Sequence, residues 1–302
     1  DDWGFFDTLS SGTSATPGLG NQTAMSGSGQ IVAGAGTAGL TLANGLFPAS
    51  GSQIDMGDPP GASTVKITRT VNSGHMAANI RGAWLSNSKT ADLSSRANTL
   101  TENGSVTEAV ASTSTELKGY SGWSSSNYME RASDSDWDVA GTTDVHMSCW
   151  IKNSSSTNSA ILGGFTNSGG TVRFQLRWGS DGSMAPVFDG ASANASFNNV
   201  GPIIDDGEWH KVEMIRRAVG TSNEQYTDGV LVGISTTDIG SLSDSGNLPL
   251  RIGRGKDSGD AVDDGSTTAL FHLSVSTAPT DTQIRQMYEA EKGMFVASAE
   301  CL

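Results

Sequence analysis

Apolar and polar side chains tend to alternate along several stretches of the chain from residue 145 onward. The clearest stretches are residues 145–152, 172–178, 210–215 and 271–275. A period of two places successive side chains on opposite faces of a β-strand, so each stretch should have one buried face and one wetter face. Asp181-Gly182, Asp228-Gly229 and Asp264-Gly265 stand between such stretches and supply the positive φ that tight hairpins need. This pattern predicts a β-sandwich or barrel.

The composition favours an all-β chain over a helical bundle. Gly accounts for 38 of the 302 residues and charged residues for 17%, against about 25% in an average globular protein. Gly, Ser, Thr and Asn fill the difference, which suits short strands and many turns. The two cysteines allow at most one bridge. We expect Cys149 to be a buried thiol, with a Cys149–Cys301 bridge as the alternative.

The net charge of −14 limits the classes of partner. Nucleic-acid binding by counterion release needs Lys and Arg side chains facing phosphates, so we expect no nucleic-acid partner. Anionic membrane surfaces are disfavoured for the same reason. An acidic surface suits solubility and partners that are neutral or arrive with cations.

No charged residue occurs between Thr8 and Ile54. The most apolar part, 31–47, is too short, too rich in Gly and too often interrupted by polar residues for a membrane span, which needs about 20 mostly apolar residues. We expect no membrane span, but a region of small-residue strands. Subunits can meet on an uncharged segment without burying an unpaired charge, so this region is a candidate for attachment or oligomerisation.

A glycine motif in the same region matches a nucleotide-binding fingerprint. Gly34, Gly36 and Gly39 fit G-x-G-x-x-G, and Asp55 lies near the position of the expected acid. A dinucleotide site needs a strand before the glycines and a helix after them, within a βαβ unit. The segment that should be helical contains Gly45 and runs into a proline. We therefore interpret the motif as a glycine-rich β segment.

A turn-rich stretch, Gly57–Ser63, separates this region from the rest of the chain. A strand pattern begins after it, at 64–68. These signals predict an N-terminal Gly/Ser-rich β region for attachment or oligomerisation at 1–79, and one sandwich domain at 80–302.

One helix is expected, close to the C-terminus. Thr280 and Gln283 form a capping-box pattern, and Gly293 is a suitable stop. Ile284, Met287 and Tyr288 follow at helical spacing. We predict a helix over about 281–291 whose apolar side chains lie on the sandwich.

The order of these segments resembles the laminin-G-like, or concanavalin A-like, jelly roll. The segments that carry the resemblance are Trp84-Leu85, Asp92–Ser95, Leu100–Gly104, Val145–Lys152, Asp206–Val212, Tyr226–Val232, Leu250–Gly253 and Leu270–Val275. Val145 stands where the family usually has an aromatic residue. The resemblance implies an all-β jelly-roll sandwich with a short C-terminal helix, preceded by the Gly/Ser-rich β region.

Three further segments, Gly82–Asp92, Glu116–Gly122 and Tyr288–Phe295, are similar to parts of structural proteins of tailed bacteriophages. The resemblance implies a virion structural protein of a tail fibre, the tail tip or another surface of the particle, and hence an extracellular location. It also implies other virion proteins as partners and a homo-oligomer, since phage fibres are frequently trimers.

Some jelly rolls of this class are glucanases, which carry paired carboxylates on one strand, as in Glu-x-Asp-x-Glu. No such run occurs in the chain. Glu289 and Glu291 lie on the expected helix, where we predict a solvated face. The sequence also has no G-x-S-x-G nucleophile elbow. We therefore expect no enzyme, and no catalytic residues.

Calcium is the one candidate cofactor, because hard cations bind several carboxylate and carbonyl oxygens. The candidate ligands are Asp134, Asp136, Asp138, Asp257, Asp260 and Asp263. An EF-hand counted from Asp134 fails, since Val139 and Val145 stand where Gly and an acid are required. The alternative is that these are acidic loops that keep sheet edges soluble. The four histidines show no zinc spacing, so we expect those within the alternating stretches to lie on sheet faces.

Two groups of aromatic and polar residues are candidates for binding a ligand. Trp178, with Arg177 and Asp181, stands at a strand end beside a hairpin turn, and Trp123 and Tyr128 lie in a Ser/Gly-rich stretch. Sugar-binding sites stack a pyranose on an exposed ring and fix it with polar groups. The alternative is that these rings pack at the edge of the core.

Together these observations predict a non-enzymatic virion surface or tail protein whose jelly roll contacts a host glycan or another structural subunit. A secreted bacterial carbohydrate-binding or adhesion module is the first alternative. A polysaccharide-cleaving enzyme is the second.

Overall fold

The computed structural model describes the two short strands 39–42 and 66–69, and most of the chain from residue 80 to residue 295. The described ranges of that part are 80–112, 117–133, 143–154, 161–166, 173–179, 181–197, 200–217, 222–242, 249–255 and 265–295. The chain divides into two compact units, one of residues 1–74 with 299–302 and one of residues 75–298. In the first unit, β1 (Gly39–Leu42) pairs in parallel with β2 (Lys66–Arg69). The boundary after residue 79 stays a prediction.

Two antiparallel sheets form the second unit. The eight-stranded sheet has the order β15 (Val230–Ser235), β14 (Ser222–Thr227), β13 (Trp209–Arg217), β8 (Asp144–Lys152), β17 (Thr267–Ser276), β6 (Lys118–Ser121) and β5 (Thr107–Val110), and β3 (Ile80–Trp84) also pairs with β17. The seven-stranded sheet has the order β12 (Asn194–Ser196), β11 (Val187–Asp189), β10 (Arg173–Arg177), β9 (Ile161–Thr166), β16 (Leu250–Ile252), β7 (Tyr128–Arg131) and β4 (Thr101–Asn103).

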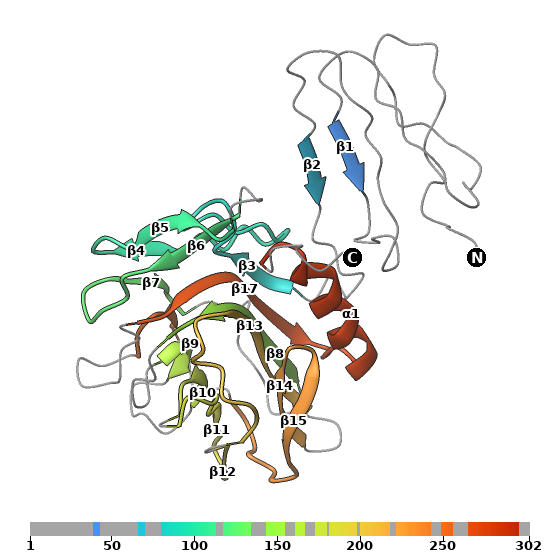
Figure 1. Ribbon diagram of the computed structural model, residues 1–302. Helices are drawn as coiled ribbons and strands as arrows, with labels where there is room; N and C mark the ends of the chain where they lie inside the picture. Colours follow the sequence, from blue (N-terminus) through green and yellow to red (C-terminus); the bar gives the residue numbers. More distant parts are fainter. Residues whose placement is uncertain are drawn as a thin grey trace, which may run out of the picture. The chain divides into compact units, whose positions relative to one another are not determined.

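The layers confirm the predicted all-β jelly-roll sandwich (Figure 1). The alternating stretches become β8, β10, β13 and β17, and one set of their apolar side chains fills the core between the sheets. Met147 and Cys149 of β8 lie there with Val212 of β13 and Phe174 of β10, all of them fully or almost fully buried. Burial of this apolar surface, worth roughly 25 cal/mol per Å², is the main force that holds the two sheets together.

The opposite face of the eight-stranded sheet is not the wetter face that alternation predicts. His146, Ser148 and Trp150 of β8 are as deeply buried as the core residues between them. The reason is a second layer of packing, in which Trp150 stacks on Phe295 with ring centroids 4.2 Å apart. The residues that follow the last strand therefore cover this face, and both sides of β8 are closed.

The covering element is the predicted helix, α1 (Asp281–Lys292). The Thr280 hydroxyl accepts a hydrogen bond from the Gln283 backbone N–H, and the Gln283 side chain accepts one from the Thr280 N–H, which confirms the capping box. Ile284 and Met287 are buried, as predicted, whereas Glu291 on the same stripe is also buried. The prediction that Glu291 belongs to a solvated face is wrong, because it lies on the side of α1 that packs on the sheet.

No helix within the described ranges has both the length and the hydropathy that a membrane span needs.

Candidate binding site

The ends of four strands of the seven-stranded sheet meet along one rim. β7 begins at Tyr128, β16 ends at Ile252, β9 begins at Ile161 and β10 ends at Arg177. Each strand runs antiparallel to its neighbour, and Ile252 is opposite both Met129 and Gly163. Arg177 is in turn opposite Ile161. We call this end of the sheet the Tyr128 rim, and define it by Tyr128, Arg177, Arg251 and Arg254.

Tyr128 is the centre of a cation–π cluster. The guanidinium carbon of Arg254 lies 4.8 Å from the centroid of the Tyr128 ring, and that of Arg251 lies 5.6 Å from it. Both distances are within the range, up to about 6 Å, in which the ring quadrupole attracts a cation. Tyr128 itself is only partly buried. The cluster therefore places two positive charges beside one accessible aromatic ring.

The two arginines differ in their other contacts. Arg251 forms an ion pair with Glu130 on the adjacent strand, and its Nη1 donates a hydrogen bond to the carbonyl of Gly255 at 3.2 Å. Arg254 is paired with no carboxylate within the described ranges, and its buried Nε has no hydrogen-bond acceptor there. Arg254 is thus the guanidinium of the rim whose charge the described side chains do not balance.

Trp123 forms the floor beside this cluster. Its side chain is 2% exposed, and Gly253 passes directly over the indole ring. A Cβ on Gly253 would lie 2.3 Å from that ring, and the residue has a φ of +84°, so glycine is required on both grounds. The glycine lets the chain cross the indole and brings Arg254 to Tyr128. Trp123 supports the rim from below and offers no ring face for stacking a sugar.

The second predicted group lies at the same end of the sheet, and one of its members is corrected. Trp178 is 0% exposed and belongs to the core, so its ring cannot stack on a ligand. Arg177 is partly buried, and Asp181 is exposed. The Asp181 carboxylate accepts hydrogen bonds from the hydroxyl and the N–H of Ser183, at 2.6 and 3.0 Å, and these lower the pKa of Asp181.

All five candidate ligand-binding residues therefore belong to one end of one sheet, although the sequence presented them as two groups. Tyr128, Arg177 and Asp181 keep accessible side chains, and the two indoles lie beneath them. The candidate calcium ligands Asp134, Asp136, Asp138, Asp257, Asp260 and Asp263 lie outside the described residues. Among those that are described, no group of three or more His, Cys, Asp or Glu side chains could hold a metal ion.

A second charged cluster, not predicted from the sequence, lies beneath α1. Lys211 Nζ is 3.0 Å from Glu291 Oε2 and 3.8 Å from Glu213 Oε1. Trp150 Nε1 donates a hydrogen bond of 2.7 Å to Glu291, and His146 Nε2 lies 2.8 Å from Glu213. We call these five side chains the buried network, since each is at most 1% exposed.

The partners of Glu291 in the buried network favour its charged form. Burial by itself would raise the pKa of Glu291, but the charge of Lys211 and the hydrogen bond from Trp150 lower it overall. Burial is also the chief reason that the pKa of the adjacent His272 is lowered. The network ties α1 to the sheet. A signal was present in the sequence, because helical spacing from Ile284 and Met287 puts Glu291 on the buried stripe.

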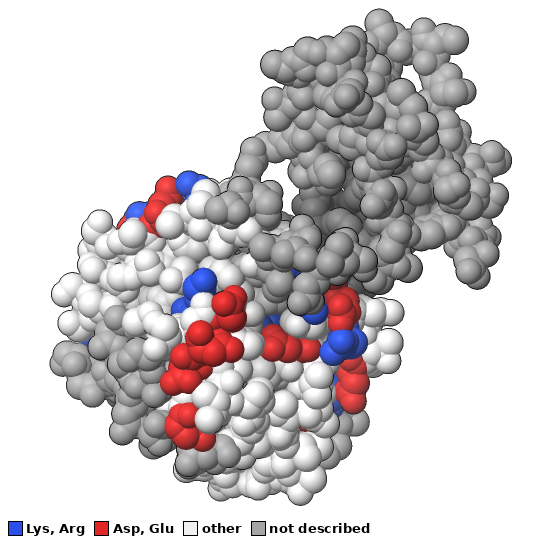
Figure 2. All heavy atoms as spheres, viewed as in Figure 1, with Lys and Arg blue, Asp and Glu red and all other residues white. Residues whose placement is uncertain are grey.

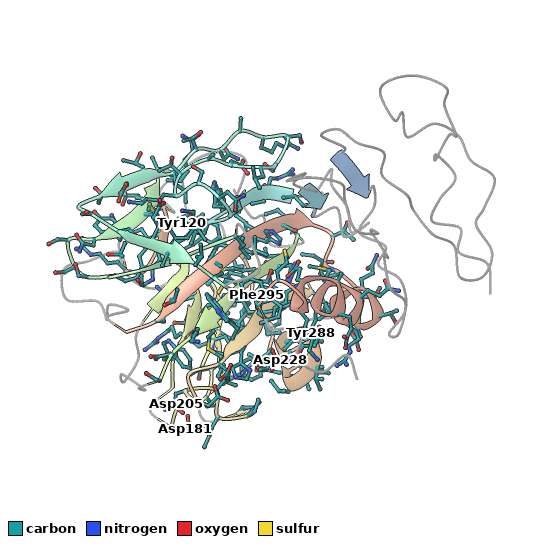
Figure 3. All side chains as sticks on the ribbon, turned by 45° about the horizontal axis from the view of Figure 1, so that its top comes forward. Tyr120, Asp181, Asp205, Asp228, Tyr288 and Phe295 are labelled. Atoms are coloured by element: carbon teal, nitrogen blue, oxygen red, sulfur yellow. The ribbon has the colours of Figure 1, made fainter. Side chains whose placement is uncertain are left out.

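His210 lies between two aspartates at the start of β13. Its Nδ1 is 2.7 Å from Asp228 Oδ2, and its Nε2 is 3.2 Å from Asp206 Oδ1. Burial opposes the charged imidazolium, but both aspartates stabilise it, and the pKa of His210 is raised overall. Asp228 lies next to Tyr288 of α1, away from Asp181 and Asp205 (Figure 3). His210 therefore links the turn at Asp228 to the start of β13. This part of the unit is separate from the Asp181 loop.

Comparison with known proteins identifies the same fold. Residues 124–272 match the model of the Concanavalin A-like lectin/glucanases superfamily. No curated protein shows significant sequence similarity to the chain.

Three solved structures illustrate the similarity. The binding domain of Paraclostridial Mosquitocidal Protein 1 aligns with a TM-score of 0.57 over 72% of this chain and 53% of that one, at 10% identity. The binding domain of Botulinum neurotoxin DC, solved with rat synaptotagmin II, gives 0.56 over 71% and 52%, also at 10% identity. Botulinum neurotoxin type C, in a structure concerned with two ganglioside molecules, gives 0.55 over 72% and 53%, at 10% identity. The chain spans about half the length of these proteins, and such low identity shows a shared fold alone.

Proposed function

We propose that this concanavalin A-like jelly roll of the laminin-G type is a non-enzymatic carbohydrate-binding module, and that the Tyr128 rim is its binding site. The observation that carries the proposal is the convergence of Tyr128, Arg177 and Asp181 on one accessible sheet end, over a floor of buried indoles. An aromatic ring with a few fixed polar groups is the usual chemistry of a sugar site. Two neighbours of this fold are binding domains, one of them in complex with rat synaptotagmin II, and a third is a neurotoxin whose cell entry depends on two ganglioside molecules. These similarities support a binding role here.

The proposal includes a place for the module in a particle. The similarity of Gly82–Asp92, Glu116–Gly122 and Tyr288–Phe295 to segments of tailed-phage proteins supports a tail-fibre, tail-tip or other surface protein of a virion. In this proposal the uncharged segment 8–54 mediates attachment or assembly into a homo-oligomer with other virion proteins. The jelly roll then faces outward toward the host glycan.

Within the described ranges, the carboxylates are not arranged as a polysaccharide-cleaving enzyme requires. Hydrolysis of a glycosidic bond needs an acid and a second carboxylate on either side of a bound sugar. Glu213 and Glu291 are sealed beneath α1, and the Asp181 carboxylate is engaged by Ser183. These contacts support binding without turnover.

Two measurements test the proposed function. The full chain, applied to a glycan array with calcium and again with a chelator, should retain a defined set of glycans; retention of none contradicts carbohydrate binding. If the chain retains glycans in calcium but not in the chelator, calcium takes part in the site. Immunogold labelling of purified particles distinguishes a virion protein from a secreted module. Label on the particle surface supports a virion protein, and protein found only free in the medium supports a secreted module.

A further inference from the structure

We propose that the Tyr128 rim selects acidic sugars, with Arg254 as the principal contact for the sugar carboxylate. This inference rests on the proposed carbohydrate-binding function and adds to it the chemical class of the ligand. Its basis is the local charge of the rim, the geometry of the stacked guanidinium and the spacing of the strands.

The described charged side chains at this end of the sheet are mostly cationic, whereas the whole chain is acidic. The chain carries a net charge of −14, and acidic side chains gather in a band across the face of the second unit shown in Figure 2. The rim instead brings Arg251 of β16 and Arg254, which follows β16, to the same end of the sheet as Arg177 on β10, and Glu130 balances Arg251. A positive site on an acidic protein retains an anion and repels cationic competitors.

The stacking of Arg254 on Tyr128 leaves the donors of its guanidinium edge for a ligand. A guanidinium that interacts with a ring through its positive charge still presents N–H groups in its own plane, and that edge fits a carboxylate through two parallel hydrogen bonds. The ring also restricts the rotation of the side chain, so less conformational entropy is lost when the ligand binds. Arg254 is therefore pre-organised for a carboxylate.

The rim is long enough for more than one sugar unit. Tyr128 on β7 and Arg177 on β10 are separated by β16 and β9, which is three strand spacings or roughly 14 Å. An oligosaccharide laid along the rim, with a carboxylate at Arg254, would reach as far as Arg177. The exposed carboxylate of Asp181, beyond Arg177, can accept hydrogen bonds from sugar hydroxyls.

The experiment compares each acidic polysaccharide with its own neutral form. Polygalacturonate, alginate and polysialic acid are titrated into the full chain, each beside its methyl-esterified counterpart, which keeps the sugar backbone and removes the charge. We expect at least one acidic polymer to bind roughly 10-fold more tightly than its ester, the loss expected when hydrogen bonds to a charged group are removed.

Two matched variants locate the preference. Arg254→Met should reduce the affinity for the acidic polymer to that for the ester. Arg285→Met is the control, because Arg285 also lies over a tyrosine ring, Tyr288, at 5.4 Å, but on α1; it should bind like the original chain. A thermal unfolding curve for each variant confirms that it is folded.

The outcomes separate this inference from the proposed function. If the chain binds glycans but treats acid and ester alike, or if Arg254→Met binds as tightly as the control, the acidic-sugar inference is overturned and the carbohydrate-binding function stands. If the array retains no glycan of any kind, the proposed function fails and the inference fails with it.

Discussion

The Tyr128 rim and the buried network use the same kinds of side chain for different ends. Each combines an aromatic residue, cations and a carboxylate, as in Tyr128 with Arg254 and Trp150 with Lys211. In the network each charged side chain has a partner and lies sealed beneath α1, so the free energy of the contacts stabilises the fold. On the rim the ring is accessible and Arg254 has no described carboxylate partner, so its contacts remain available to a ligand. Exposure, more than residue type, separates a structural cluster from a binding site.

The largest effect is expected from breaking the buried network. Lys211→Met leaves two carboxylates without their cation in a region closed to water, and should reduce the free energy of unfolding by about 3–5 kcal/mol. Denaturant unfolding of the purified chain measures the change. A double variant with Glu291→Leu removes one of the orphaned charges and should recover part of the loss. If the free energy of unfolding of Lys211→Met alone lies within about 1 kcal/mol of that of the original chain, the structural role of the network is contradicted.

The next effect concerns the floor of the rim. Gly253→Ala puts a methyl group into the Trp123 ring and forces a side chain into positive φ, which should cost about 1–3 kcal/mol. The same change should displace Arg254 and weaken binding of the acidic polysaccharide. Gly293→Ala is the control, since a Cβ there meets nothing within 4 Å and its φ is −62°. Equal stability of the two variants would show that the floor does not constrain the rim.

The third effect is a dependence on pH at His210, which is neither on the rim nor in the network. The pKa of His210 is raised in the folded chain. Its contribution to the free energy of unfolding is therefore complete at any pH below the pKa of the unfolded chain, about 6.5. That contribution is lost as the pH rises through the higher folded value. Comparing the unfolding free energies of the original chain and His210→Gln between pH 5 and pH 9, roughly the range around that value, should show a difference that shrinks toward alkaline pH. A difference that grows with pH would contradict the assigned direction.

The smallest effect is expected at an exposed ion pair. Arg285 and Glu289 form an i,i+4 pair on the solvent side of α1, with about half of each side chain exposed. Glu289→Gln should change the stability by about 0.5 kcal/mol or less. Glu291→Gln, two residues away but in the buried network, should cost several times more by the same denaturant measurement. Similar losses for the two glutamates would remove the distinction between exposed and buried charge on which the comparison rests.

The fold was predictable because its signals are local. The alternation around Met147 and Val212, the Asp228-Gly229 turn between β14 and β15, and the capping box at Thr280 each specify one element, and each is confirmed. Asp264 of the Asp264-Gly265 turn lies outside the described residues. The second covered face was not predicted, because a strand pattern does not show whether the polar side of a sheet faces water or a helix. Glu291 was misassigned for that reason, although helical spacing from Ile284 already placed it on the buried stripe.

Sequence reasoning selected Tyr128 and Arg177 of the rim, but neither Arg251 and Arg254 nor the arrangement of the four. Tyr128 and Arg177 are 49 positions apart and come together only because β16 and β9 lie between their strands in the sheet. Strand order is a long-range property that the local pattern does not contain. The local pattern also does not show which rings are exposed, and Trp178, one of the candidate stacking residues, belongs to the core.

The most direct test of the central claim, binding without turnover, is a single titration in which binding and chain cleavage are followed in the same sample. The polysaccharide that the full chain binds most tightly is incubated with it, and bound polymer and new reducing ends are both measured over time. The account predicts saturable binding with no increase in reducing ends at any protein concentration. Reducing ends that increase in proportion to the protein, and that are lost together with a carboxylate variant, would contradict it.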